Sequence, residues 1–379
     1  MAEEKKSGVD APKKKRLLVA TDNFLPRYDG ISRFLKEVLP VLIEQYDVTV
    51  VCPNFGPVHY PGVVIVQLPL STWKLGDYTA PRFAFRRVAE LVREHDLVFT
   101  QGVGPIGWAA IRAAHTKKKV VLYMHSIDWE LVPKAATNPF LKIFLPGFVK
   151  WFVRRQYKRC DLVLIPSEGV AETLAWNHFD VEKRIVQLGV NVKEFVPAKD
   201  KVAAKEKLGI PKDAIVVGYH GRLSPEKDVK TLLRGFLRTK GTTLLVVGAG
   251  ATDIENSLKR RNVIMVGAQD NVVPYLQAMD IYVMPSLTET TCLSVLEAMS
   301  CGLPVISTPV GYVRDYIENG KNGYIFPKGD SYSLALAINK LAVDSILRER
   351  IGITARTSVQ TRFTWDKTRT RIKEIFEGL

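Results

Sequence analysis

Two acidic side chains, Glu289 and Glu297, have seven residues between them in the segment SLTETTCLSVLEAMSCGLPVIST, residues 286–308. The residues between them have a composition typical of a helix. The apolar segment before them, AMDIYVMPS, predicts a buried strand. Glu289 is therefore expected in the loop at the carboxyl end of that strand, the edge at which an open α/β sheet binds its ligands.

The spacing of these two acids limits the chemistry that they can perform. If both lie on one helix, its rise of 1.5 Å per residue separates them by roughly 12 Å along the axis. The paired carboxylates of glycosidases lie roughly 5 to 9.5 Å apart, so a hydrolase is disfavoured. The larger separation suits the two ends of one extended ligand. An exposed helix with two solvated acids is the alternative that spacing alone leaves open.

Two cationic side chains, Arg222 and Lys227, follow another predicted strand in the segment GRLSPEKD, residues 221–228. Gly221 permits a close approach of the backbone to a ligand, and the Ser-Pro pair after it predicts a helix start. Fixed cations of this kind stabilise the negative charge that grows on a departing diphosphate. A surface ion pair with an acid of the same segment is the alternative.

Five further polar or small residues fall at expected strand ends or helix starts. His125 follows the strand VVLYM, with Asp128 as a nearby hydrogen-bond acceptor, although a lone histidine is more often structural. Asp29 and Gly30 end the loop after the first strand, where an ordinary Asp-Gly turn is the alternative. Ser167 either contacts a ligand or caps the next helix.

The elements that would position these residues alternate along the chain. Strand-like and helix-like runs follow one another in two series, which predicts two parallel sheets covered by helices on both faces. The strand-like runs are RLLVATD, DVTVVCP, DLVFTQG and VVLYMHS in the first series, and AIVVGYHG, TLLVVGAG, VIMVGA, IYVMPS and PVISTP in the second. The polar segment VNVKEFVPAKDKVAAKEKLGIPKD separates them and is interpreted as a linker.

We therefore expect an α/β protein of two domains, with residues 16–195 in the first and 196–362 in the second. A chain of 379 residues, 46% of them hydrophobic, is long enough for two such cores. The basic, aperiodic residues 1–15 are interpreted as a disordered tail. The last predicted helix, 363–379, is expected to pack back on the first domain.

The composition excludes several classes of protein. The four cysteines are scattered without a C-x-x-C pair, which favours a reducing, cytosolic setting. No apolar run reaches the roughly 18 residues of a membrane-spanning helix. VVGAGATD begins like a dinucleotide fingerprint, but Asp253 stands at its third small position, and the P-loop motif is absent. No metal-ligand cluster is recognisable, so we expect neither a cofactor nor a metal.

The order and spacing of GRLSPEKD, VVGAG, the two glutamates and EAMSCGLPVI resemble glycosyltransferase family 4. YMHS and the loop after the first strand extend the resemblance to the first half, although Asp29 stands where the family usually carries one of two adjacent glycines. The resemblance implies the GT-B arrangement, in which two Rossmann-like domains with parallel sheets face each other across a cleft. It also implies retaining transfer of a hexose by front-face attack, without a protein nucleophile.

The same resemblance implies roles for the candidate residues. Glu289 would contact hydroxyls of the donor sugar, and Glu297 would contact those of the ribose. Arg222 and Lys227 would neutralise the diphosphate, and His125 would lie near the reacting sugar. Asp29 and Asp128 are weaker candidates for contact with the acceptor. Further donor contacts are expected at Gly30 and Gly221 and at the amides of a helix N-terminus formed by Thr290, Thr291 and Cys292.

A basic and aromatic segment indicates a second partner. The formal net charge is +15, and between residues 112 and 159 eleven Lys and Arg side chains accompany two acids, a local net charge of +9. Aromatic residues recur every four positions in NPFLKIFLPGFVKWFVRRQYKRC, which is typical of a segment lying in a membrane interface. The Pro-Gly pair at 146–147 is expected to break this segment, and one aromatic face packed as core under the first sheet is the alternative. The candidate membrane contacts are Phe140, Phe144, Lys150, Trp151, Arg154 and Arg155.

These observations lead to one preferred function. We expect a metal-independent enzyme that moves a hexose from a UDP- or GDP-sugar, its donor substrate, to a hydroxyl of a membrane lipid. It would act as a peripheral protein at the cytoplasmic membrane face. A soluble acceptor, or a nucleotide-sugar-binding protein without turnover, is the alternative. A nucleic-acid binder is disfavoured, because the basic stretch contains no recognition module. The sequence leaves the oligomeric state open.

Overall fold

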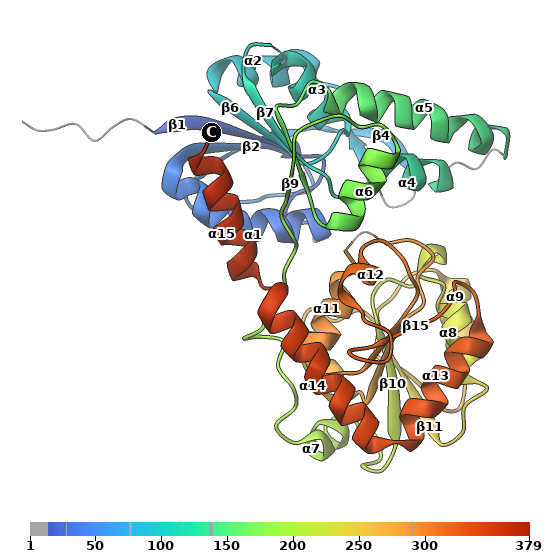
Figure 1. Cartoon of the computed structure of the whole chain (residues 1–379). Helices are drawn as coiled ribbons and strands as arrows, with labels where there is room; N and C mark the ends of the chain where they lie inside the picture. Colours follow the sequence, from blue (N-terminus) through green and yellow to red (C-terminus); the bar gives the residue numbers. More distant parts are fainter. Residues whose placement is uncertain (1–13, 28, 76–77, 115, 136–138, 290) are drawn as a thin grey trace, which may run out of the picture. The chain divides into compact units, whose positions relative to one another are not determined.

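The computed structural model describes residues 14–27, 29–75, 78–114, 116–135, 139–289 and 291–379. The chain divides into two compact units, each built on its own parallel sheet (Figure 1). One unit comprises Met1–Leu164, His178–Arg184 and Ile372–Leu379, and the other comprises Ile165–Asn177 and Ile185–Arg371. The predicted α/β fold with two Rossmann-like domains is confirmed.

The first sheet has seven strands in the order β3-β2-β1-β6-β7-β8-β9. They are β1 (Lys15–Ala20), β2 (Tyr46–Pro53), β3 (Val63–Leu68), β6 (Leu97–Thr100), β7 (Lys119–Tyr123), β8 (Leu162–Ile165) and β9 (Lys183–Ile185). Every residue of β6 and β8 is buried, as expected for short apolar strands covered on both faces. A separate antiparallel pair is formed by β4 (Leu70–Leu75) and β5 (Tyr78–Pro81).

The second sheet has six strands in the order β12-β11-β10-β13-β14-β15. They are β10 (Ile215–His220), β11 (Thr242–Val247), β12 (Val263–Met265), β13 (Ile281–Met284), β14 (Val305–Ser307) and β15 (Tyr324–Ile325). All their pairings are parallel. Figure 1 shows α8 and α13 on one face of this sheet and α11 and α14 on the other, so its strands are buried from both sides.

Helices connect the strands in both units. Before the second sheet they are α1 (Gly30–Gln45), α2 (Phe85–Glu94), α3 (Pro105–Ala114), α4 (Asp128–Ala135), α5 (Pro139–Tyr157), α6 (Glu168–Trp176) and α7 (Lys201–Glu206). Those after its first strand are the 3₁₀ turn η1 (Pro225–Lys227), α8 (Val229–Phe236), α9 (Thr252–Leu258), α10 (Val273–Ala278), α11 (Leu293–Ser300), α12 (Val313–Tyr316), α13 (Ser331–Val343), α14 (Ser345–Arg362) and α15 (Trp365–Glu377).

The strand orders locate the ligand-binding edge of each sheet. In both, the order reverses at one point, between β1 and β6 in the first sheet and between β10 and β13 in the second. Loops at the carboxyl ends of the strands that flank such a switch point diverge, which leaves room for a ligand. The loop after β10 carries Arg222 and Lys227, and the loop after β13 carries Glu289. Sheet topology therefore brings these three candidates to one edge of one unit.

Helix α5 departs from the expectation that Pro146 and Gly147 would break the basic segment. The helix runs without interruption from Pro139 to Tyr157, with Pro146 inside it. A proline in a helix removes one backbone hydrogen bond, and intact turns on both sides can carry the helix across it. The same holds for Pro40 within α1. The predicted break was wrong.

Candidate active site

Glycines lock together the two loops that follow β10 and β11. Gly221 and Gly248 have φ angles of +144° and +145°, which residues with a side chain rarely adopt. A Cβ atom on Gly248 would lie 1.9 Å from the carbonyl oxygen of Gly221, and one on Gly250 would lie 2.2 Å from that of Leu223. Leu223 also forms an isolated parallel bridge with Gly250. VVGAG therefore supports the loop that carries Arg222, a role that its residue pattern does not predict.

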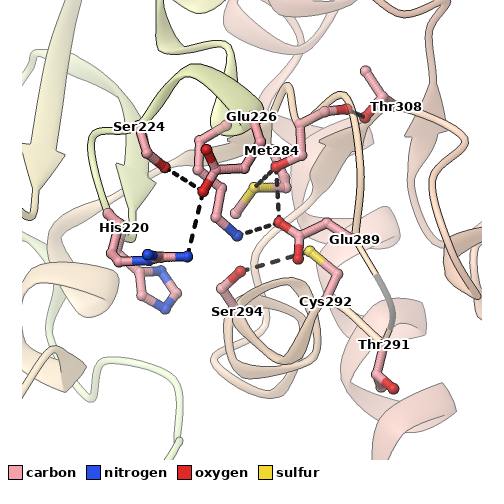
Figure 2. A network of polar contacts seen from close by, with 12 residues as sticks. His220, Ser224, Glu226, Met284, Glu289, Thr291, Cys292, Ser294 and Thr308 are labelled. Atoms are coloured by element: carbon pink, nitrogen blue, oxygen red, sulfur yellow. Dashed lines mark hydrogen bonds and ion pairs between the residues drawn. The ribbon is translucent and has the colours of Figure 1, made fainter. Parts of the chain in front are cut away.

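The side chain of Arg222 forms the surface ion pair that the sequence left as an alternative. Its Nη2 lies 3.3 Å from Oε1 of Glu226, and 59% of the arginine side chain is exposed. Ser224 donates a hydrogen bond of 2.6 Å to the same carboxylate oxygen (Figure 2). Beneath them, the buried Tyr219 donates from its hydroxyl to the carbonyl oxygen of Arg222. The backbone at Arg222 is thus held in place while its guanidinium extends from the loop.

Lys227 and Glu289 form a direct ion pair between Nζ and Oε1, and their side chains are only 17% and 13% exposed. Ser286 donates to the same oxygen of Glu289 at 2.8 Å, and Thr308 donates to the carbonyl oxygen of Ser286. Burial lowers the pKa of Lys227, but the charge of Glu289, the neighbouring Cys292 and the hydrogen bond to Glu289 together outweigh it and raise the pKa. The lysine is therefore a fixed cation, and Glu289 is not the solvated acid of the alternative hypothesis.

Glu297 lies on α11 and is buried, with 4% of its surface exposed. Its Oε2 is 2.8 Å from Nε2 of His220, the last residue of β10, which is also buried. His220 is not predictable from the sequence as a partner of Glu297, because the two residues are 77 positions apart and meet through the pairing of β10 with β13. A titratable residue at the end of a strand that precedes a glycine loop was the available signal.

The segment before α11 differs from the predicted helix N-terminus. Helix α11 begins at Leu293, so Glu289 does not cap it, and Cys292 has a left-handed backbone with φ of 55°. This conformation interrupts a right-handed helix, so an earlier start is not possible at this position. Thr291 and Cys292 are both buried, while Thr290 lies outside the described residues. Burial, and then the charge of Glu289, raises the pKa of the Cys292 thiol, which stays protonated.

In the other unit, His125 follows β7 and packs against aromatic rings. Its ring centroid lies 5.3 Å from that of Phe34 and 4.5 Å from that of Tyr123. Nε2 of His125 lies 2.8 Å from Oε1 of Gln101, the residue after β6. Burial lowers the pKa of His125 to about 3, so the imidazole is neutral at physiological pH. A neutral ring can bind by hydrogen bonds but is not an acid at that pH.

Asp128, at the start of α4, accepts a hydrogen bond of 2.5 Å from the hydroxyl of Ser126. Burial raises the pKa of Asp128 to about 6, and the bond from Ser126 opposes this shift only in part. Asp128 therefore changes its protonation state close to neutral pH.

Asp29, Gly30 and Ser167 occupy helix starts. Oδ1 of Asp29 accepts from the amides of Ile31 and Ser32 at 3.0 and 2.9 Å, so this carboxylate caps α1. Ser167 likewise caps α6, accepting from Val170. A Cβ atom on Gly30 would meet none of the described atoms within 4 Å, so the backbone there is open to an approaching group. Of these three residues, Asp29 and Ser167 have a structural role in the helices that they cap.

Two family models cover most of the chain. The model described as Glycosyltransferase Family 4 matches residues 28–194, and that described as Glycosyl transferases group 1 matches residues 200–358. The chain belongs to these glycosyltransferases. The resemblance found in the sequence is thereby confirmed, and the protein is an enzyme that uses a nucleotide sugar.

Relatives of this glycosyltransferase span nearly its full length. It is 26% identical to a GDP-mannose-dependent alpha-mannosyltransferase of Mycobacterium tuberculosis, with 92% of each chain covered. It is 25% identical to a GDP-mannose-dependent alpha-(1-6)-phosphatidylinositol monomannoside mannosyltransferase of Mycolicibacterium smegmatis, covering 96% of the chain and 98% of the relative. A structure of Anabaena Alr3699/HepE with UDP-glucose has a TM-score of 0.76 at 19% identity, covering 96% and 100% of the two chains, and shows the shared fold.

The glycosyltransferase also carries an exposed basic and aromatic face on α5. Phe144, Phe148 and Trp151 are 75%, 61% and 57% exposed, whereas Val149 and Val153 are buried. A surface hollow of about 610 Å³ is lined by Trp151, Arg154, Arg155, Lys158 and Arg159. One face of α5 is thus core and the other is open, while the side chain of Phe140 lies outside the described residues. Within the described ranges, no helix has the length and apolar character to cross a bilayer, and no three potential metal-ligating side chains cluster.

Proposed function

We propose that this glycosyltransferase moves a hexose from a nucleoside diphosphate sugar to a hydroxyl of an anionic membrane lipid, with retention of configuration and without a metal. The observation that supports it most is the part-buried Lys227–Glu289 pair beside Arg222 at the switch point of the second sheet. It offers a carboxylate for sugar hydroxyls and fixed cations for a diphosphate within one unit. These groups suit the two adjoining parts of a donor molecule.

The reaction needs cations where negative charge grows. The bond between C1 of the sugar and the diphosphate oxygen breaks, a bond forms between C1 and the acceptor oxygen, and the hydroxyl proton passes to the leaving phosphate. Lys227 remains charged because the carboxylate of Glu289 raises its pKa, and Arg222 is charged at any working pH. Both cations stabilise the leaving diphosphate more than the intact donor. Cys292, protonated and buried, offers no nucleophile, which agrees with front-face attack.

The remaining residues are assigned to the ends of the donor and to the acceptor. Glu297 would bind the ribose hydroxyls, and the backbone at Gly30 and Gly221 would approach the phosphates. His125, as a neutral ring, would donate or accept a hydrogen bond at the sugar rather than transfer a proton. Asp128 is the candidate acceptor contact, because the carboxylate of Asp29 already binds the amides of α1.

Two observations support an anionic lipid as the acceptor. The hollow beside α5 combines the ring of Trp151 with Arg154 and Arg155 on the helix and Lys158 just after it, and each such cation near an anionic leaflet contributes on the order of 1 kcal/mol. Burial lowers the pKa of Arg159, and the nearby positive charges of Arg155 and of Arg112 on α3 lower it further. A cluster of cations that repel one another favours the binding of anions. Two relatives are named as phosphatidylinositol monomannoside mannosyltransferases.

The donor is tested by a panel of UDP- and GDP-hexoses with thermal unfolding as the readout. A donor at 100 times its Kd stabilises the folded state by about 2.7 kcal/mol, so the true donor raises the melting temperature most. GDP-mannose is the first candidate, because four relatives that cover more than 90% of both chains are named for it. The panel is repeated with Lys227→Gln, and with Lys230→Gln as a matched control in an exposed ion pair with Asp253. A panel in which no nucleotide sugar shifts the transition would refute the proposal.

The acceptor is tested with vesicles. The protein is expected to sediment with vesicles that contain phosphatidylinositol at low salt, and to transfer labelled sugar into the lipid extract. Arg155→Ala with Lys158→Ala weakens sedimentation, whereas Arg184→Ala, which removes an exposed cation from β9, leaves it unchanged. Transfer to a soluble acceptor without vesicle binding would favour the soluble alternative.

A further inference from the structure

His220 and Glu297 form a polar pair that the proposed mechanism uses only in part. Their side-chain atoms Nε2 and Oε2 are 2.8 Å apart, and the two residues are 6% and 4% exposed. Because a carboxylate only accepts hydrogen bonds, the proton in this contact is on Nε2 of His220. The other ring nitrogen, Nδ1, is buried and has no hydrogen-bond partner among the described residues. All the polar contact of the ring is therefore directed at Glu297.

The position of the His220 ring is fixed from several sides. Its ring centroid lies 5.3 Å from that of Tyr282 on β13, and the hydroxyl of Tyr282 donates to the carbonyl oxygen of His220 at 3.3 Å. The next residue, Gly221, donates its amide to the carbonyl oxygen of Val247 on β11. β10 is thus tied to its two neighbours at the residue that holds Glu297.

Stability alone does not account for such a pair. Replacing a buried polar or ionic pair by apolar side chains of similar volume is often neutral or stabilising. Here the pair lies at the switch point of the sheet, directly before the loop that carries Arg222. The pair links two parts of the proposed donor site. His220 directly precedes the loop with Arg222, proposed to bind the diphosphate, and is hydrogen-bonded to Glu297, proposed to bind the ribose.

We infer that His220 is a positioning residue that orients the carboxylate of Glu297 for the ribose hydroxyls and thereby sets the preference for ribonucleotides over deoxyribonucleotides. The inference rests on the proposed role of Glu297. The hydrogen bond from Nε2–H of His220 keeps the carboxylate of Glu297 in one rotamer. A hydroxyl bonded to an oriented carboxylate strengthens binding more than one bonded to a carboxylate that rotates away, because no ordering cost is added.

The experiment compares nucleotides that differ by one hydroxyl. Dissociation constants are measured for GDP and 2′-deoxy-GDP, and for UDP and 2′-deoxy-UDP, and the pair that binds wild type more tightly is retained. Losing a hydrogen bond to a charged group is expected to weaken wild-type binding roughly 10- to 100-fold. In His220→Leu the ratio of the Kd of the deoxyribonucleotide to that of the ribonucleotide is expected to fall to about 3 or less, since a carboxylate that is not held in place discriminates poorly between the two. In His220→Gln, whose amide can donate to Glu297, most of the ratio returns.

Controls separate positioning from general damage. His95 is a second buried histidine, in the other unit, and its Nδ1 is hydrogen-bonded to the carbonyl oxygen of Leu91. His95→Leu therefore also removes one hydrogen bond of a buried histidine, but it changes no contact of α11. It is expected to lower the melting temperature and to leave the ribose-to-deoxyribose ratio at the wild-type value. If His220→Leu does not fold, His220→Gln and a shorter donor, His220→Asn, supply the comparison, with Asn expected to lose the ratio that Gln keeps.

The outcomes distinguish the inference from the proposed function. If His220→Leu weakens both nucleotides equally and keeps the wild-type ratio, His220 is structural and the inference is overturned. If wild type and Glu297→Gln both show a ratio near 1, Glu297 does not bind the ribose, and the proposed role of Glu297 fails together with the inference. A high ratio in wild type that falls in both Glu297→Gln and His220→Leu supports both.

Discussion

The two titratable residues after β7 are expected to change the stability of their unit with pH in opposite directions. Burial lowers the pKa of His125 from 6.5 to about 3, and burial raises that of Asp128 from 3.8 to about 6. Between pH 3.8 and about 6, His125 is protonated and Asp128 is ionised in the unfolded chain, whereas in the folded unit His125 is neutral and Asp128 is protonated. The substitutions His125→Asn and Asp128→Asn separate the two effects.

The sign follows from proton uptake on unfolding. The free energy of unfolding changes by about 1.4 kcal/mol per pH unit for each proton by which the unfolded and folded states differ. The contribution of His125 is complete above pH 6.5 and is lost as the pH falls toward 3, so stability rises with pH. The contribution of Asp128 is complete below pH 3.8 and is lost as the pH rises through 6, so stability falls with pH. In wild type the two slopes largely cancel between about pH 4.5 and 6.

The assay is urea unfolding followed by tryptophan fluorescence at several pH values, with each variant compared with wild type so that other groups cancel. Trp129, which stacks on Phe179 in the same unit, is a local reporter. Over 1.5 pH units Asp128→Asn is expected to gain about 2 kcal/mol relative to wild type as pH rises, and His125→Asn to lose about the same. Parallel curves for wild type and both variants would show that neither group is held out of its ordinary protonation state.

Three further predictions concern the second unit. Arg222→Ala is expected to lower kcat roughly 10²- to 10³-fold, the loss of one preorganised charge stabiliser, and an unchanged kcat would remove Arg222 from the mechanism. Gly248→Ala is expected to lower the free energy of unfolding in urea by about 3 kcal/mol or more, because the added Cβ would lie 1.9 Å from a backbone oxygen. The control is Gly241→Ala, which is also at positive φ but has no described atom within 4 Å of its Cβ, and it is expected to lower that free energy by about 1 kcal/mol. Lys227→Met alone leaves the part-buried Glu289 without its cation and is expected to destabilise the unit by about 3 kcal/mol. Lys227→Met with Glu289→Leu is expected to restore the stability but not the transfer, and an equal loss of stability in both variants would contradict this expectation.

The alternation of strands and helices, and the polar residues at strand ends, could be predicted from the sequence because they depend on local pattern. Strand β10 was recognised from its apolar run, and Arg222 and Lys227 were placed after it for the same reason. The start of α11 was not predictable, because the left-handed backbone of Cys292 leaves no mark in residue type. Likewise, the continuity of α5 through Pro146 depends on intact turns on both sides rather than on the proline itself.

Contacts between segments that are distant in the chain also could not be predicted from the sequence. The glycines of VVGAG resemble part of a nucleotide fingerprint in the sequence, whereas their contact with Gly221 and Leu223 depends on β10 and β11 being neighbours. His220 is part of a predicted strand and has no role predicted from the sequence, since its partner is on α11, a helix that follows three further strands. Asp29 is predicted as a weaker candidate for contact with the acceptor, with an Asp-Gly turn as the alternative. Whether its carboxylate faces a ligand or its own helix depends on side-chain geometry that the sequence pattern does not reveal.

The second unit buries charge where an ordinary core would bury apolar groups. Moving an ion out of water costs several kcal/mol even after relaxation, and a buried pair recovers this only in part. Lys227, Glu289 and Glu297 are all mostly buried, and all lie at the carboxyl edge of one sheet, next to its switch point. An apolar edge would fold at least as well, so stability does not explain why charged groups are concentrated there. A ligand that carries both hydroxyls and phosphates does explain it, because the same preformed charges that cost folding energy need no reorganisation when such a ligand binds.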